Sequence, residues 1–100
     1  MKSYYELDTA TRQRAQEHFF AVILEEMLDG RFPWDQLGSR RGTIQAQVEH
    51  VRKQGDRYTQ KQTLAEAFRP DLRRVAQRYA QRAHYLEPGE HAVAVQDLTP

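Results

Sequence analysis

The sequence predicts an all-α protein, a small bundle of three or four helices with a short β element formed by the terminal segments. Most of the chain places apolar residues three or four positions apart, which is the period of a helix that buries one side. Prolines and glycines separate these stretches, and the alternation typical of strands is confined to the two ends. The chain has the length of one domain, so we expect residues 1–100 to form a single helical domain.

Composition excludes several classes of protein. The chain has no cysteine, which rules out disulfides, thiolate catalysis and cysteine-bound zinc. The first residues lack the apolar run of a signal peptide, and the longest apolar run, "FFAVIL" at 19–24, is far too short to span a membrane. We therefore expect a cytoplasmic protein that has no contact with a membrane.

Charge is distributed unevenly along the chain. Residues 1–37 contain four Lys or Arg and seven Asp or Glu, whereas residues 38–85 contain eleven bases and four acids. The remaining residues carry three acids and no base. Such asymmetry indicates either a face that binds nucleic acid or complementary surfaces that meet within a dimer.

The N-terminal part predicts an extended arm followed by a long helix. "KSYYEL" alternates in the manner of a strand, so residues 1–7 are expected to be extended. Asp8 has the side chain of an N-cap, and Gly30 suits the left-handed position that ends a helix. The first helix should therefore run from Thr9 to Asp29.

This helix has a broad apolar side. Its large apolar residues cover about half of the helix circumference; they are Phe19, Phe20, Ile23, Leu24, Met27 and Leu28. A helix of this kind is either the central helix of the core or is shared with another subunit. The second interpretation predicts a homodimer with Phe20, Leu24 and Met27 near the two-fold axis.

The stretch "GRFPWDQLGSRRGT" at 30–43 is predicted to be a loop, because it contains three glycines and a proline. It also carries Phe32 and Trp34. These aromatic residues either cover the core as a lid or project as anchors for a partner. Together with the first helix they define a candidate protein interface, which consists of Phe20, Leu24, Met27, Phe32 and Trp34.

The second half of the chain predicts two or three more helices. One should run from Thr43 to near Gly55 and another from Thr59 to Phe68, and a single helix through 43–69 is an open alternative. Pro70 fits the first turn of a final helix over 71–86. Residues 90–96 alternate as a short strand, and its expected partner is the N-terminal arm, in the same chain or in a second subunit.

The sequence lacks the common signatures of catalysis. It has no glycine-rich phosphate loop, no G-x-S-x-G and no H-E-x-x-H. Its histidines are scattered, and none follows a glutamate at the i, i+3 spacing of a carboxylate-bridged metal site. We therefore predict that the protein is not an enzyme, and that it has no catalytic residues, no metal site, no cofactor and no small-molecule ligand.

The segment "KQTLAEAFRPDLRRVAQRYA" at 61–80 resembles a helix-turn-helix motif in its spacing. The apolar and small positions of that motif are matched by Leu64, Ala65, Phe68 and Val75. The segment departs from the motif at three positions, where it has Arg69 in place of the turn glycine and Pro70 and Arg78 in place of apolar residues. The resemblance implies a nucleic-acid-binding regulator that reads its target with the second helix of the pair.

The last predicted helix also carries a ridge of arginines. Arg74, Arg78 and Arg82 are four residues apart, so they stand one turn apart on the side opposite the apolar stripe. With the loop residues Arg40 and Arg41 they form a candidate face for nucleic acid or for an acidic partner. The acidic partner could be a second subunit, through its Glu25 and Asp29.

The function predicted from the sequence is that of a small, non-catalytic regulatory or adaptor protein that acts by binding another protein, as a homodimer. The alternative is a nucleic-acid-binding regulator that uses the arginine-rich helix 71–86. The two alternatives differ in what they require. A nucleic-acid binder needs the arginines to line up and stay accessible, whereas an adaptor needs exposed apolar or aromatic anchors.

Overall fold

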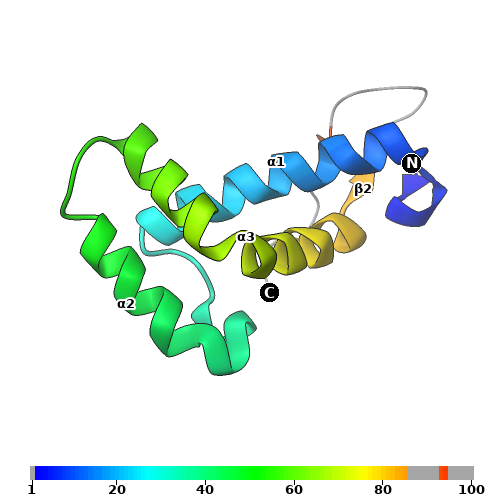
Figure 1. Ribbon diagram of the computed structural model, residues 1–100. Coiled ribbons are helices and arrows are strands. Elements are labelled where there is room, and N and C mark those ends of the chain that lie inside the picture. The colour runs from blue at the N-terminus through cyan, green and yellow to red at the C-terminus, as the bar shows by residue number, and fades with distance from the viewer. Residues whose placement is uncertain (1, 86–92, 95–100) are drawn as a thin grey trace.

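The computed structural model describes residues 2–85 and 93–94 and confirms an all-α fold with a small β element (Figure 1). The described part contains three α-helices, two 3-10 helices and three two-residue strands. In chain order these are β1 (Lys2–Ser3), η1 (Tyr4–Glu6), α1 (Thr9–Leu28), η2 (Trp34–Arg40), α2 (Arg41–Val51), α3 (Arg57–Arg82), β2 (His84–Tyr85) and β3 (Val93–Ala94).

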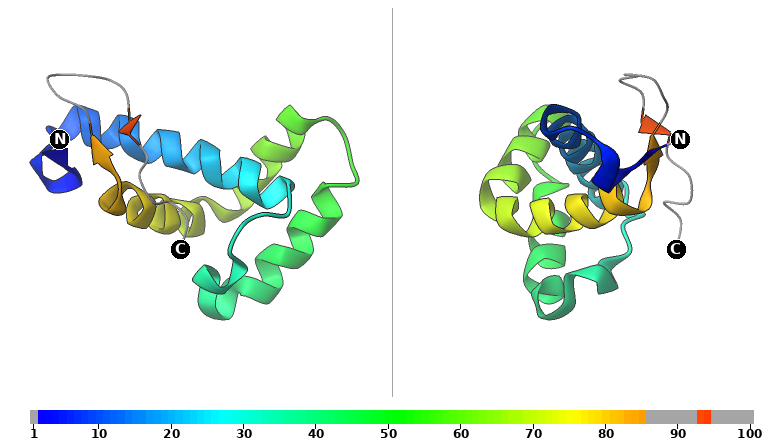
Figure 2. Two further views of the ribbon diagram at one scale, coloured as in Figure 1. Left: turned by 180° about the vertical axis from the view of Figure 1, so that it is seen from behind. Right: turned by 90° about the vertical axis from the view of Figure 1, so that its right-hand side faces the viewer.

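Helix α1 and the second half of α3 (69–82) lie side by side and run in opposite directions (Figures 1 and 2). The small sheet lies at one end of this pair and α2 lies at the other end. The predicted first helix is confirmed almost residue by residue. Asp8 caps it by accepting a 2.7 Å hydrogen bond from the amide of Thr11, and Gly30, with φ of 74°, follows its last turn.

The broad apolar side of α1 is covered within the chain. Ala15, Phe19, Ile23 and Met27 are spaced four residues apart, and each is at most 1% exposed. They belong to a single core that draws on every helix and on the loop before η2; its largest fully buried side chains are Phe19, Ile23, Met27, Ile44, Val48, Leu64, Leu72, Val75, Tyr79 and Tyr85. Helix α1 is therefore the central core helix, and its breadth needs no second subunit.

Tyr79 of α3 contacts two residues of α1. Its ring meets the Phe19 ring edge-on, with 6.1 Å between the ring centroids, and its hydroxyl donates a 3.0 Å hydrogen bond to the Glu26 carboxylate. Burial and the negative charge of Glu26 both raise the pKa of Tyr79. The contact buries a large aromatic ring and also satisfies its polar end, as a core tyrosine requires.

The region 43–69 forms two helices, which answers a question that the sequence left open. Helix α2 begins at Arg41, two residues before the predicted Thr43, and it ends at Val51. Gly55, with φ of 68°, lies in the turn to α3. Gln60 secures this turn, because its buried amide donates to the carbonyls of Arg52, Gln54 and Gly55.

The prediction of two helices at 59–68 and 71–86 is confirmed in the break between them and is wrong in the end of the second. Both stretches belong to α3, which kinks at Phe68, where φ is −128° and ψ is 27°. Pro70 causes the kink, because it has no amide hydrogen for the carbonyl four residues earlier and its ring crowds that carbonyl. The helix ends at Arg82 and not at Leu86, because Ala83 is extended and His84–Tyr85 pair as a strand.

The strands pair in a different order from the predicted one. The sheet order is β1-β2-β3 with antiparallel pairs, so β2 lies between the N-terminal strand and β3 (Figure 2). Within the described residues 2–7 of the predicted arm, only Lys2–Ser3 form a strand. The amide of Ser3 then donates to the Glu6 carboxylate, and η1 begins at Tyr4. Of the predicted strand 90–96, only Val93–Ala94 is described and the rest lies outside the described residues. Sequence reasoning missed β2 because its two residues are too few to show alternation.

Among the described residues, no helix combines the length and the apolar character that crossing a membrane would require.

Tyr85 is expected to make the stability of the protein depend on pH in the alkaline range. Its buried hydroxyl donates a 2.6 Å hydrogen bond to the carbonyl of Ala80, and burial raises its pKa to about 12 from its usual value of 10. A raised tyrosine pKa stabilises the fold fully below pH 10, and this contribution is lost as the pH rises toward 12. We expect the free energy of unfolding, measured in guanidinium chloride, to fall between these pH values, and to fall less in Tyr85→Phe. Equal slopes for the two proteins would contradict this.

Candidate functional site

A buried carboxylate gathers arginines from two distant parts of the chain. The Asp71 side chain is 7% exposed and receives two hydrogen bonds from Arg40, at 3.2 Å from Nε and 3.4 Å from Nη2. It receives a third from Arg74, at 2.7 Å. The two guanidinium groups remain accessible, with side chains 48% and 63% exposed. Asp71 therefore fixes the position of two charges while leaving them available to a partner.

Arg78 and Arg82 continue this surface along α3. Arg78 donates a 3.1 Å hydrogen bond to the carbonyl of Gln36, and the Arg82 guanidinium lies 5.8 Å from the centre of the Tyr79 ring. Both arginines are exposed, and neither has an acidic partner among the residues that the structure describes. Arg40, Arg74, Arg78 and Arg82 together form what we call the arginine face.

A shallow polar hollow of about 310 Å³ lies within the arginine face, between η2 and α3. Asp71, Arg74 and Arg78 line it from α3, and Gln36 and Ser39 line it from η2. The Gln36 Oε1 atom is buried and has no hydrogen-bond partner among the described residues. The hollow gives the face a recess in which a polar group of a partner could be enclosed.

The structure thus brings together four of the five predicted basic residues. Arg41 is the exception, because it bonds to Gln45 on its own helix, at 3.3 Å between Nε and Oε1. Arg40 and Arg74 are 34 positions apart in the sequence, and the fold makes them neighbours. Asp71 was missed as a functional residue, although a single acid within "RPDLRR" was a usable signal.

The helix-turn-helix geometry implied by the resemblance at 61–80 is not formed. Residues 61–80 lie within α3, whose two helical segments meet directly at the kink at Phe68, with no turn of several residues between them. A helix-turn-helix needs a short turn that sets its helices at a large angle, so that the second enters the groove of DNA. The spacing of Leu64, Ala65, Phe68 and Val75 instead reflects burial in the core of this fold, where Ala65 is only partly covered.

Three residues of the candidate protein interface are in the core. Leu24, Met27 and Phe32 are 6%, 0% and 3% exposed, so the folded chain does not present them to a partner. Burial within one chain therefore accounts for Leu24 and Met27 without a two-fold axis, and the homodimer stays a prediction. Their burial follows from the kinked α3 and the loop before η2, which together cover more of α1 than a single helix would.

The remaining two interface candidates are partly exposed. Trp34 packs against the core, and its ring meets the Phe32 ring edge-on with 5.3 Å between centroids, which agrees with a lid. Phe20 is different, because it is the one phenylalanine of the four that the core does not bury. The Arg69 guanidinium lies over its ring at 5.9 Å from the centroid.

Phe20 opens into a groove of about 560 Å³ between α1 and α3. Gln13, Gln16 and Glu17 line the groove from α1, and Arg69, Arg73 and Ala76 line it from α3. Neither Arg69 nor Arg73 has an ion-pair partner among residues 2–85 and 93–94. The groove therefore combines a partly covered aromatic ring with two available positive charges.

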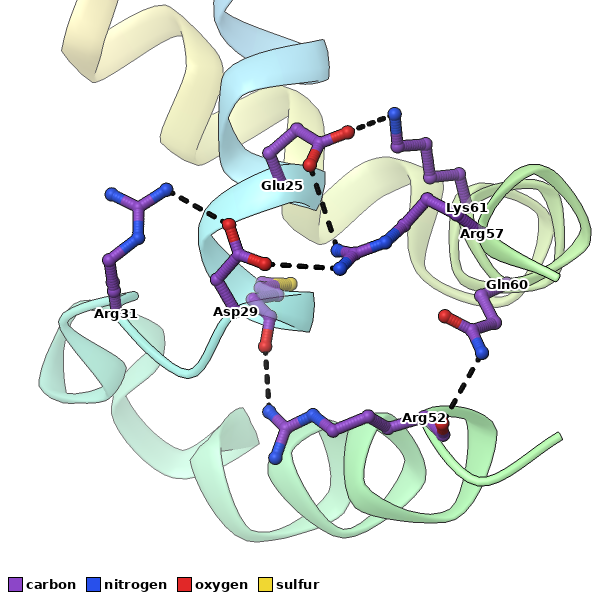
Figure 3. A network of polar contacts seen from close by, with 8 residues as sticks. Glu25, Asp29, Arg31, Arg52, Arg57, Gln60 and Lys61 are labelled. Atoms are coloured by element: carbon purple, nitrogen blue, oxygen red, sulfur yellow. Dashed lines mark hydrogen bonds and ion pairs between the residues drawn. The ribbon is translucent and has the colours of Figure 1, made fainter.

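Near the C-terminal end of α1, acidic residues from the first part of the sequence pair with basic residues from the second part (Figure 3). Arg57 of α3 lies 3.6 Å from the Glu25 carboxylate and 3.1 Å from that of Asp29, and Lys61 pairs with Glu25. Hydrogen bonds from Arg31 and Arg57 lower the pKa of Asp29. These acids are therefore already paired within one chain. They are not free to pair with the arginines of a second subunit, which was the contact expected from the sequence.

The described residues contain no group of three or more histidine, aspartate or glutamate side chains that could hold a metal ion. Comparisons with protein-family models, with curated proteins and with solved structures found no match for this chain.

Proposed function

We propose that this chain is a non-catalytic regulatory or adaptor protein whose arginine face binds an acidic surface of another protein. The observation that carries the proposal is the clamp of Arg40 and Arg74 by the buried Asp71. An aspartate among arginines reduces the net positive charge, so a surface selected for charge alone would not need it. An aspartate that holds two guanidinium forks in place favours directed, bidentate recognition of carboxylates.

Two observations favour a protein over nucleic acid as the partner. The formal net charge is only +1, whereas proteins that follow a phosphate backbone carry a marked excess of positive charge. The helix that carries the arginines packs into the core along its length and is not presented by a helix-turn-helix.

The test is capture of proteins from a native lysate with the full chain as bait, before and after nuclease treatment. We expect at least one protein to be retained after nuclease treatment and to be lost with Arg74→Gln/Arg78→Gln/Arg82→Gln. The matched control is Arg12→Gln/Arg14→Gln/Lys53→Gln, which removes three cations outside the arginine face and should retain the partner. Asp71→Asn should weaken capture even though it makes the protein more positive, because it releases the clamp.

Binding to duplex DNA and to RNA across a salt series decides the alternative. If the arginines contact phosphates, affinity falls steeply as salt rises, and the slope of log affinity against log salt should become less steep by about two to three in the triple variant. That result, together with capture that nuclease abolishes, would overturn the proposal in favour of nucleic acid. We expect no binding at about 50 mM salt that depends on these three arginines.

A further inference from the structure

The groove between α1 and α3 differs from the arginine face in having an apolar component. Phe20 is only partly covered, whereas Ala76 is 1% exposed, so a bulky apolar side chain placed there would bury the open part of the Phe20 ring. At about 560 Å³ the groove is within the size range of sites that enclose small groups. It is formed by two helices that the core holds rigidly, so binding would not have to order it.

The charge on the α3 wall identifies the chemistry of the occupant. Arg69 and Arg73 are one turn apart, which separates them by about 6 Å along the helix. The Arg69 guanidinium already lies over the Phe20 ring at 5.9 Å, so a ligand on that ring would also meet the positive charge. Glu17 adds one negative charge on the α1 wall, where the other polar side chains are the neutral amides of Gln13 and Gln16.

We propose that this groove binds a short acidic segment of the partner protein through one bulky apolar side chain, which packs on Phe20 while flanking carboxylates pair with Arg69 and Arg73. The carboxylates lie on the α3 wall, away from Glu17. This inference rests on the proposed function, because it takes the partner to be an acidic protein, and it adds an apolar anchor to the recognition.

Host–guest peptides test the anchor directly. The probe is a six-residue glutamate peptide with phenylalanine at one position, titrated into the ¹⁵N-labelled full chain. The comparison peptides are the same host with alanine, and a glutamine host with phenylalanine. We expect the glutamate peptide with phenylalanine to bind at least about fivefold more tightly than either, with amide shifts at Phe20, Arg73 and Ala76.

Variants assign the binding to the groove. Arg69→Gln/Arg73→Gln should weaken the phenylalanine peptide by about tenfold, the size of two exposed charge contacts. Gln13→Trp, at the exposed rim, should block the groove without disturbing the core, and Glu17→Gln should tighten binding about twofold. The matched control Arg14→Gln/Lys53→Gln removes two cations that do not line the groove and should leave the affinity unchanged.

The failure of this inference can be distinguished from that of the proposed function. If the alanine and phenylalanine peptides bind equally and only Arg74→Gln/Arg78→Gln/Arg82→Gln weakens them, the groove is not an anchor site and the arginine face remains. Absence of binding by the phenylalanine peptide, or equal binding by the Arg69→Gln/Arg73→Gln variant, also overturns the groove. The proposed function is tested separately, by the loss of lysate capture in Arg74→Gln/Arg78→Gln/Arg82→Gln, so it can fail or hold independently of the groove.

Discussion

Met27→Ala is expected to lower the free energy of unfolding by about 2–5 kcal/mol, the range for truncation of a buried methionine. Met27 is fully buried in the core of one chain, so the truncation leaves a cavity beneath α3. Small domains are stable by about 5–15 kcal/mol, so this single change removes a large share of the stability. Urea unfolding of the wild type and the variant measures the difference.

The same experiment separates a core position from a dimer interface. If Met27 belongs to the monomer core, the unfolding midpoint is independent of protein concentration in both proteins. If Met27 were at a two-fold axis, the unfolding midpoint of the wild type would rise with protein concentration. The variant would then sediment as a monomer, at half the mass of the wild-type dimer. Tyr58→Ala is the matched control, because Tyr58 is 67% exposed and its truncation should change the stability little.

Trp34→Ala is expected to lower the free energy of unfolding by about 2–4 kcal/mol, toward the lower end for aromatic truncations because the ring is only partly buried. The ring packs edge-on against Phe32, which is itself buried, so its removal uncovers Phe32 in the loop before η2. Thermal and urea unfolding both report this loss.

The position of Trp34 also bears on partner binding. As a lid, it should affect capture only to the extent that the fold is lost, and capture measured at low temperature should persist. Unchanged stability combined with loss of the captured protein would show instead that Trp34 is an anchor. Arg31→Ala, an exposed change at the start of the same segment, controls for disturbance of the loop.

The fold was predictable where local signals acted alone. Asp8 and Gly30 marked the ends of α1 because a cap and a left-handed glycine act within one turn. Pro70 was a correct sign of interruption, and the helices predicted on its two sides are present, but the sequence could not show that they join at a kink without a loop. Gln60 lies in a very polar stretch and is nevertheless buried, because three carbonyls of the preceding turn need its amide.

The site was predictable in its residue types and not in its arrangement. The ridge Arg74, Arg78 and Arg82 followed from helical spacing, because residues four apart share one side. The apposition of Arg40 with Arg74 depends on how η2 returns against α3, which no local pattern encodes. The broad apolar side of α1 was ambiguous for the same reason, since the number of elements that cover a helix is a property of the whole fold.

The pairing of β1 with β2 has a consequence for synthesis on the ribosome. Residues 2–3 pair with residues 84–85, so the first strand waits for nearly the whole described chain to be translated. At about 5–20 residues per second, this delay is about 4–16 s. For part of this delay α1 has been translated but α3 has not, so the broad apolar side of α1 is uncovered. We therefore expect nascent chains to be substrates of ribosome-associated chaperones until α3 has been released from the exit tunnel.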